Sequence, residues 1–261
     1  MGHPLRVLGA GAIYHVIGRG NNRRPVFLED AGHAEFLELF GELSKKFDWT
    51  THAYCLMGNH FHIALTTNEA NLSDGMRELM GRFSRWHNTT YGRSGHLFGG
   101  RYRAKLIRDD RQLLSVARYI VRNPVAAGLV EAPQDWEWSN YRAIVGISPG
   151  QVFLSPDVVL GVLHRRPLYA RVLFRAFVEE PLPSDVQPGG GPHFYVPAPS
   201  PRPSARAIVA AMGTEMGVRA CLALGHGHGQ IAEAVGLSRS AISRRRGRGP
   251  DRSPRVSDTG R

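Results

Sequence analysis

Strand-like and helix-like patterns alternate between Ala12 and Gly146, and this alternation constrains the fold more than any other feature of the sequence. Side-chain periods of two and of 3.6 residues follow one another along this stretch, separated by runs of turn-forming residues. The segments expected as strands are 12–18 and two parts of 50–66, and those expected as helices are 29–48, 71–88 and 109–122. Such alternation predicts an α+β sandwich in which helices pack on one face of an antiparallel sheet.

The chain beyond this region divides into zones of different composition. Prolines at plausible first-turn positions predict two short helices within 155–180. The run that follows, residues 181–204, is too rich in proline and glycine to form a packed helix or strand. The expected organisation is a first domain over 1–146, a helical extension over 147–180, a linker over 181–204, a small helical module over 205–248 and a disordered basic tail over 249–261.

The charge of the chain indicates a polyanionic partner. Lys and Arg number 33 against 22 Asp and Glu, which gives a formal net charge of +11. Such an excess favours nucleic acid first and anionic membrane surfaces second, although it can also serve solubility alone. No apolar run approaches the roughly 20 residues that span a bilayer, so no membrane partner is expected. Without a signal-peptide pattern, we expect a cytoplasmic, nucleoid-associated protein.

The two cysteines, Cys55 and Cys221, lie far apart in the sequence. Their spacing indicates neither a disulfide framework nor a zinc–thiolate site.

One strand-like segment, residues 54–65, contains His60 and His62. Because side chains alternate along a strand, both imidazoles point to one face, while Phe61 and Ile63 anchor the other face in the core. Neighbouring neutral imidazoles suit a divalent cation and leave positions open for a phosphate oxygen. The simpler interpretation is two polar residues on a half-buried strand, and a short His-x-His match taken alone favours it.

The helix expected over 109–122 places Tyr119 nearly opposite its apolar stripe. Such a tyrosine is either a plain surface residue or one whose hydroxyl is used. Asn123 follows one turn later, where its amide oxygen could complete a metal site or orient the phenol. We expect the helix to end there, because the residue before Pro124 disfavours the helical conformation. A phenol needs help to attack phosphorus, and nearby positive charge could supply it. These cations are Arg101, Arg103, Lys105, Arg118 and Arg122.

Several blocks of sequence occur in an order that resembles a known family. They are Ile-Tyr-His-Val at 13–16 with Arg-Gly-Asn at 19–21, residues 53–62 around the histidine pair, 95–102, 118–130 around the tyrosine, and 138–142. Together they resemble the REP-associated tyrosine transposases, within the HUH single-tyrosine transposases of bacterial insertion sequences. The resemblance covers residues 4–146 and, more weakly, the helices up to 180. Gly58 departs from the pattern, since the family usually has proline before Asn-His, and glycine stiffens that turn less.

The resemblance implies a ferredoxin-like sheet, with the histidines on a central strand and Tyr119 on a helix across the site. It also implies Mg²⁺ or Mn²⁺ as cofactor, held by His60, His62 and Asn123. Tyr119 would attack hairpin-bearing single-stranded DNA, leaving a 5′-phosphotyrosine and a 3′-hydroxyl that can later rejoin strands. The expected DNA contacts of this domain are Arg19, Asn21, Arg101, Lys105, Arg118 and Arg122. The alternative for these residues is solvated surface charge.

Residues 228–244 have the pattern of a helix-turn-helix. Gly236 would form the turn, Ser238 would cap the second helix, and Ile242 would anchor it against the first. The side chains expected to face the major groove of duplex DNA are Arg239, Ser240, Ser243 and Arg244. A generic helical hairpin is the alternative.

Two rival functions belong to other classes. The first is a sequence-specific regulator that uses the C-terminal module while its N-terminal domain is catalytically retired. The presence of His60, His62, Tyr119 and Asn123 together argues against it, since a retired site has no chemical reason to keep all four. The second is a replication-type nickase, which the single candidate tyrosine disfavours. Either a monomer or a homodimer is compatible with the sequence.

Overall fold

The computed structural model describes residues 9–180 and 203–246. The chain forms two compact units, one ending at Arg202 and the other beginning at Pro203. The expected linker, apart from residues 203 and 204, and the expected tail over 249–261 lie outside the described residues. No helix in the described ranges is both long enough and apolar enough to cross a membrane.

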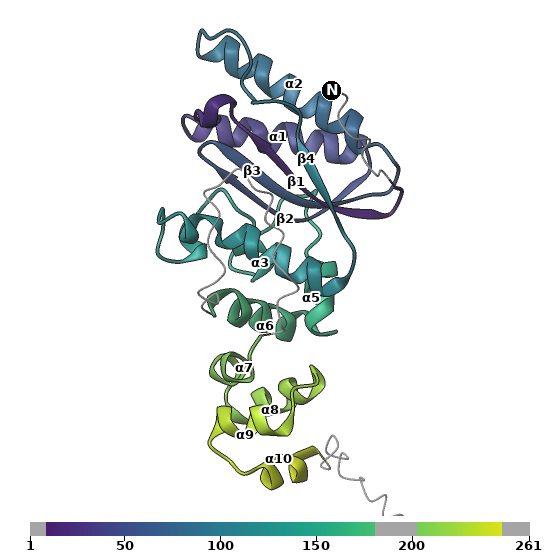
Figure 1. The fold of residues 1–261 in the computed structure, drawn as a ribbon, viewed down its shortest axis with the longest axis vertical. Helices are drawn as coiled ribbons and strands as arrows, with labels where there is room; N and C mark the ends of the chain where they lie inside the picture. Colours follow the sequence, from purple (N-terminus) through teal and green to yellow (C-terminus); the bar gives the residue numbers. More distant parts are fainter. Residues whose placement is uncertain (1–8, 181–202, 247–261) are drawn as a thin grey trace, which may run out of the picture. The chain divides into compact units, whose positions relative to one another are not determined.

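Four strands form one antiparallel sheet in the first unit, in the order β2-β3-β1-β4 (Figure 1). The strands are β1 (Ala12–Arg19), β2 (Trp49–Met57), β3 (His60–Thr67) and β4 (Arg103–Ile107). Helix α1 (Asp30–Lys46) connects β1 to β2, and α2 (Leu72–Thr90) connects β3 to β4. This βαββαβ order with β1 and β3 in the centre is the ferredoxin-like arrangement, so the expected fold class is confirmed.

One face of the sheet packs on α1 and α2 and contains the main core. Val16, Phe61 and Ile63 alternate onto this face and are fully buried with Phe36 and Phe83 from the two helices. Phe61 occupies the space beside Gly18, where an added Cβ would meet its ring at 2.3 Å. These packed apolar side chains fix the register of the central strands, because a slip of one residue would turn them toward the opposite face.

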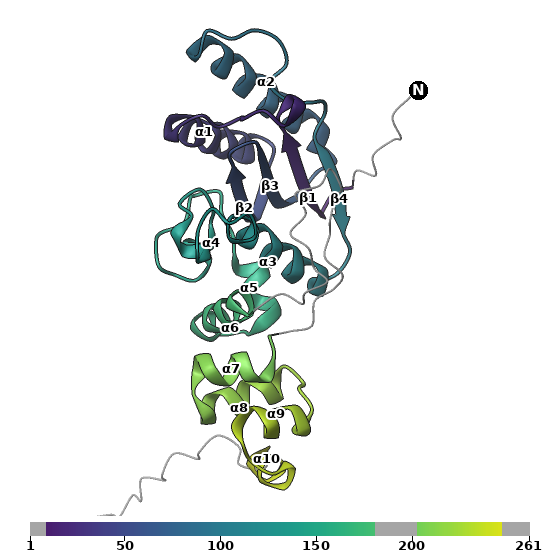
Figure 2. The same cartoon turned by 60° about the vertical axis from the view of Figure 1, so that its left-hand side comes forward.

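Helix α3 (Asp110–Ala126) lies against the opposite face, next to β2 and β3 (Figures 1 and 2). The prediction of helices on one face therefore holds for α1 and α2, whereas α3 adds a layer on the other side. The predicted apolar stripe of α3 is buried. The helix continues through Pro124 to Ala126 and does not end at Asn123 as predicted. Gly128, with φ of 67°, then turns the chain away.

The segment after α3 covers the free edge of β2. Asn140 accepts from the backbone N–H of Tyr54 at 2.8 Å and donates to the carbonyl of His52 at 3.2 Å. The carbonyl of Trp138 accepts from the N–H of Leu56 at 2.8 Å. These bonds satisfy backbone groups that an edge strand leaves unpaired. Among the described residues, the unit also contains the helices α4 (Tyr141–Ile144), α5 (Asp157–Leu163) and α6 (Pro167–Glu179).

The second unit is helical. Its elements are α7 (Ala205–Met212), α8 (Thr214–Ala223), α9 (His228–Val235) and α10 (Arg239–Arg246). Gly236 has the left-handed φ of 67° that a tight turn between α9 and α10 requires. The hydroxyl of Ser238 accepts from the N–H of Ala241 at 3.2 Å, as expected of an N-cap. Ile231 and Ile242 are fully buried between the helices.

Candidate active site

The face of the sheet next to α3 contains several histidine and basic side chains. His15 and Arg19 reach it from β1, and His60 and His62 reach it from β3. The register pairs Arg19 with His60 and Ile17 with His62. On the other side of β1, Lys105 pairs with His15, so Arg103 and Lys105 of β4 share this face. Sequence period and register together gather imidazoles and cations at one place.

His60 follows the tight turn between β2 and β3. Its Nδ1 lies 2.6 Å from the side-chain oxygen of Asn59, whose amide nitrogen donates to the carbonyl of Arg23 at 3.1 Å. The carbonyl of Gly58 accepts from the N–H groups of Val26 and Phe27 at 2.9 and 3.0 Å. These bonds hold the turn although it lacks the family's proline.

His62 is buried next to two other imidazole rings. Its Nδ1 lies 3.0 Å from Nε2 of His15, and the two ring centroids are 5.1 Å apart. Its ring centroid lies 4.9 Å from that of His60, with the planes at 86°. His15 was quoted in the resemblance but not predicted as a site residue. The strand alternation that identified the histidine pair would also have placed His15 on this face.

All three imidazoles are neutral at neutral pH. Burial lowers the pKa of His60 to about 4, with a further contribution from Arg19. Burial also lowers the pKa of His15 to about 3, and Lys105 adds to the effect. The pKa of His62 falls well below its ordinary value, first through burial and then through His15, His60 and Arg19. Neutral imidazoles are the form that binds metal ions.

Tyr119 lies across this face on α3. Its ring centroid is 5.5 Å from that of His62 and 6.0 Å from that of His15, in edge-on contacts at 86° and 71°. The side chain is half-buried, off the buried stripe of its helix. The side-chain amide of Asn123, one turn later, donates to the carbonyl of Tyr119 at 2.9 Å. Because Asn123 uses its NH₂ group in that bond, its side-chain oxygen does not take part in it.

The cations on this face differ in exposure. Burial lowers the pKa of Arg19, and so do Arg23 and Arg103, while Tyr119 raises it. The Nε atom of Arg19 is buried without a hydrogen-bond partner. Arg101 and Lys105 are exposed, and Asn21 is half-buried in the short 3-10 turn Asn21–Arg23 after β1. Arg103 was predicted to supply positive charge but not to contact DNA, and its position on β4 adds it to the cationic face.

Arg118 and Arg122 were predicted to contact DNA, but their side chains bind the end of helix α6. Arg118 is buried over the ring of Phe177 at 4.5 Å, and it donates to the carbonyl of Glu180. Arg122 donates to the carbonyls of Val178 and Glu180. Carbonyls at the end of a helix lack partners within the helix, so both guanidinium groups cap α6. We correct the prediction for these two residues, because groups held in this way are not available to DNA.

A metal ion at this site would depend on few protein ligands. Within residues 9–180 and 203–246, no three His, Cys, Asp or Glu side chains lie close enough together to hold one. The remaining donors are Nε2 of His60, Nε2 of His62 and the amide oxygen of Asn123. Two imidazoles and an amide oxygen fit a divalent cation that keeps open positions for phosphate.

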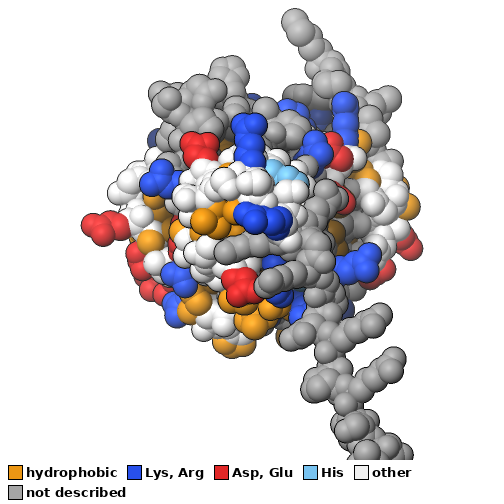
Figure 3. Space-filling view, turned by 90° about the horizontal axis from the view of Figure 1, so that it is seen from below, with side chains coloured by type: hydrophobic (Ala, Val, Ile, Leu, Met, Phe, Trp, Pro, Cys, Tyr) orange, Lys and Arg blue, Asp and Glu red, His pale blue; other side chains and the backbone are white. Residues whose placement is uncertain are grey.

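The candidate DNA-contacting residues of the second unit lie on α10. Arg239, Ser240, Ser243 and Arg244 are all exposed. The guanidinium of Arg239 lies against the first turn of α9, where a Cβ at Gly229 would meet its Nε at 3.1 Å. On the face drawn in Figure 3, Lys and Arg side chains are scattered among acidic, hydrophobic and other side chains, so net charge alone does not locate a DNA surface.

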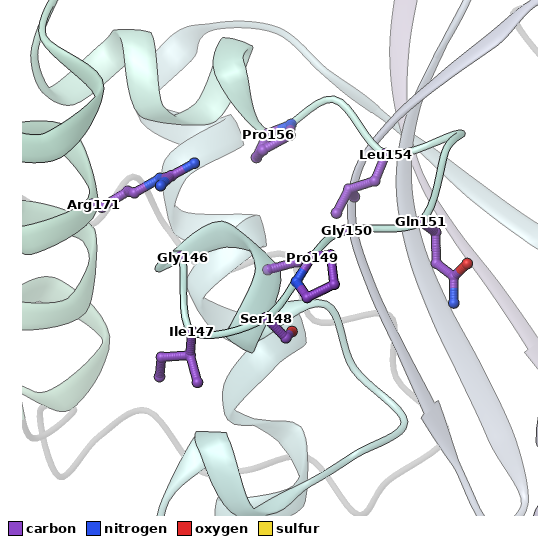
Figure 4. A pocket seen from close by; sticks show the side chains of 10 residues that line it. Gly146, Ile147, Ser148, Pro149, Gly150, Gln151, Leu154, Pro156 and Arg171 are labelled. Atoms are coloured by element: carbon purple, nitrogen blue, oxygen red, sulfur yellow. The ribbon is translucent and has the colours of Figure 1, made fainter.

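A surface hollow of about 530 Å³ lies elsewhere in the first unit. Its walls are the loop over 146–151 with Leu154, Pro156 and Arg171 (Figure 4). None of the candidate site residues lines it. The hollow therefore gives no support for a second catalytic centre.

Comparison with known proteins finds similarity to transposases over the first unit. The sequence profile of the family described as "Transposase IS200 like" matches residues 10–123. A REP-associated tyrosine transposase of Haemophilus influenzae is 29% identical over 120 residues, which cover 41% of this chain and 68% of that protein. The solved structure of a REP-associated tyrosine transposase bound to a REP hairpin has the same fold, with a TM-score of 0.50, at 21% identity. That match covers 60% of this chain and 93% of the other. Residues 10–123 are therefore similar in sequence to IS200-like transposases, and the first unit has the fold of a REP-associated tyrosine transposase.

Proposed function

We propose that this protein cleaves and rejoins hairpin-bearing single-stranded DNA in a metal-dependent reaction, with Tyr119 as the nucleophile. The observation that carries the proposal is the edge-on position of Tyr119 at 5.5 Å from His62, which stands beside His60 on the sheet. A nucleophile next to a pair of neutral imidazoles is what phosphoryl transfer at a metal-assisted site requires.

The residues proposed to hold Mg²⁺ or Mn²⁺ are His60, His62 and Asn123. Burial keeps both imidazoles neutral, and because each Nδ1 already has a hydrogen-bond partner, Nε2 is the nitrogen proposed for ligation. When bound, a divalent cation supplies Lewis acidity at a non-bridging phosphate oxygen.

The hydroxyl oxygen of Tyr119 attacks the scissile phosphorus in the proposed reaction. A bond forms between this oxygen and phosphorus, and the bond from phosphorus to the 3′ oxygen breaks. The phenolic proton is released to solvent, and the departing 3′ oxygen takes up a proton to become a hydroxyl. Arg19 interacts electrostatically with Tyr119, so its positive charge lies near the attacking oxygen. Attack by a 3′-hydroxyl on the 5′-phosphotyrosine reverses the exchange, so strands are joined without a further energy source.

The proposed substrate is a single strand that forms a hairpin, the kind of DNA bound in the structural relative. Arg19, Asn21, Arg101 and Lys105 are the proposed backbone contacts, and Arg103 joins them from the same face of β4. Phosphate contacts of this kind give affinity that falls steeply with salt.

We further propose that α9 and α10 bind duplex DNA. The left-handed turn at Gly236, the cap at Ser238 and the buried Ile242 support a helix-turn-helix. Exposed Arg244 and Ser243 would then lie in the major groove.

The test is incubation with labelled hairpin single-stranded DNA from repeats that flank the gene, followed by denaturing electrophoresis. With Mn²⁺ or Mg²⁺ we expect a covalent protein–DNA band that disappears with chelator and in Tyr119→Phe. Tyr91→Phe is the matched control, because its hydroxyl donates to Glu29 at 2.9 Å, outside the site. Tight DNA binding without any adduct would instead favour a catalytically retired regulator.

A further inference from the structure

Each imidazole of the proposed metal pair has a hydrogen-bond partner on its Nδ1 atom. His60 has the side-chain oxygen of Asn59, and His62 has the ring of His15. The two partners come from different elements, the β2–β3 turn and the buried centre of β1. A neutral imidazole has one N–H and one lone pair, so a partner on one nitrogen decides what the other nitrogen can do.

The second hydrogen bond of the Asn59 amide shows which residue donates in the bond between Asn59 and His60. A carbonyl can only accept, so the Asn59 atom that contacts the carbonyl of Arg23 at 3.1 Å is the NH₂ group. The atom at 2.6 Å from His60 is therefore the amide oxygen, which also only accepts. His60 must donate from Nδ1, and its lone pair is on Nε2.

The bond between His15 and His62 holds one proton between two ring nitrogens 3.0 Å apart. Two protons there would clash, and two lone pairs would repel. Either His62 donates from Nδ1 and keeps a lone pair on Nε2, or His15 donates and His62 has N–H at Nε2. Only the first arrangement allows His62 to bind a cation through Nε2.

We propose that His15 and Asn59 are positioning residues, which hold His62 and His60 in the tautomer with a lone pair on Nε2. The inference rests on the proposed metal-dependent function. His15 is fully buried and its ring also contacts Tyr119 edge-on at 6.0 Å, so the orientation of its ring is fixed by packing. Partners of this kind orient ligand histidines in metal sites and typically change metal affinity 10- to 100-fold when removed.

The first experiment measures histidine tautomers in the metal-free protein, from the side-chain ¹⁵N chemical shifts of ¹⁵N-labelled samples. We expect both His60 and His62 in the Nδ1–H form. In His15→Leu, His62 should lose this fixed form while His60 keeps it, and in Asn59→Ala the pattern should be reversed. A wild-type His62 with its proton on Nε2 would overturn the proposal, even if neither variant folds.

The second experiment titrates Mn²⁺ into the same proteins and follows it by electron paramagnetic resonance. We expect a 10- to 100-fold loss of affinity in His15→Leu and a smaller loss in His15→Gln, whose amide oxygen can accept from His62. His52→Leu is the matched control. His52 is another buried histidine, bonded to the hydroxyl of Thr66 at 2.7 Å, so its loss should lower stability and leave Mn²⁺ affinity unchanged.

These outcomes separate the inference from the function on which it rests. If wild-type protein binds no Mn²⁺ but shows both Nδ1–H tautomers, the metal dependence fails and the positioning by His15 and Asn59 stands. If Mn²⁺ binds and His15→Leu binds it equally well, the metal site stands and the role of His15 is wrong.

Discussion

The ring of Tyr119 lies 5.5 Å from the ring of His62, and the two planes meet at 86°. One residue is on a helix and the other on the central strand β3, so their proximity depends on how α3 packs on the sheet. Two features fix that packing, the buried apolar stripe of α3 and the two arginines that bind the end of α6. Tyr119 is thus held in place by contacts of α3 with both neighbouring layers.

Replacing Arg118 should loosen this arrangement. Arg118→Met removes the bond to the carbonyl of Glu180 and the contact over Phe177, and we expect a loss of about 1–3 kcal/mol in unfolding free energy. Denaturant titration measures it. Arg111→Met is the control, because Arg111 is exposed on the same helix. Unchanged stability combined with a large loss of DNA affinity would return Arg118 to the DNA-binding surface.

Helix α2 offers a matched pair of glycines. A Cβ at Gly75 would meet the ring of Trp49 at 2.3 Å, so Gly75→Ala should destabilise the protein by about 1–3 kcal/mol through overpacking. At Gly81 the nearest atom is the flexible end of Arg85 at 3.7 Å, and Gly81→Ala should stabilise the helix by roughly 0.5–1 kcal/mol. The midpoint temperatures of thermal unfolding should shift in opposite directions in the two variants. A shift of the same sign in both would contradict the close packing of Gly75 against Trp49.

Acid should destabilise the metal-free protein through its buried histidines. The pKa of His15 is about 3 in the folded state and near 6.5 when unfolded, so below pH 6.5 the unfolded chain binds the extra proton. Stability is therefore lost as the pH falls, and His15 alone accounts for about 2 kcal/mol between pH 7 and pH 5. Urea titrations at both pH values should show that acidification lowers the free energy of unfolding less in His15→Leu than in the wild type. Equal losses would mean that His15 is already protonated, or solvated, in the folded protein.

The proposed helix-turn-helix of α9 and α10 should act independently of the DNA cleavage reaction. Arg244→Ala is expected to weaken duplex binding. If Arg244 contacts a phosphate, the slope of log binding constant against log salt concentration should also become shallower by about one unit. Cleavage of hairpin single strands should persist. Arg219→Ala is the control in the same unit, since Arg219 pairs with Glu215 on α8. If both variants bind duplex DNA equally well, α10 is not the recognition helix.

Local patterns predicted much of this fold. Period-two alternation placed His60 and His62 on one face, and the helical period placed Tyr119 off the buried stripe. The layer formed by α3 on the second face was not predicted, because the sequence does not say which side of a sheet a helix covers. The end of α3 was also placed too early, since packing on the sheet outweighs the local preference at Pro124.

The partners of the site residues were harder to predict. Arg118 and Arg122 have the same side chain as Arg19, and only the tertiary structure shows that they bind carbonyls of α6 while Arg19 faces the imidazoles. His15 was recognisable as a strand histidine, but its bond to His62 depends on the pairing of β1 with β3. Such pairings join residues far apart in the chain.

The measurement that tests the central claim most directly is mass spectrometry of the covalent adduct. Protein incubated with hairpin single-stranded DNA and Mn²⁺ is digested with protease and nuclease, and the peptide that carries a nucleotide is sequenced. We predict a 5′-phosphate nucleotide on Tyr119, absent with chelator and in Tyr119→Phe. A nucleotide on any other residue, or an adduct that persists in Tyr119→Phe, would contradict the account.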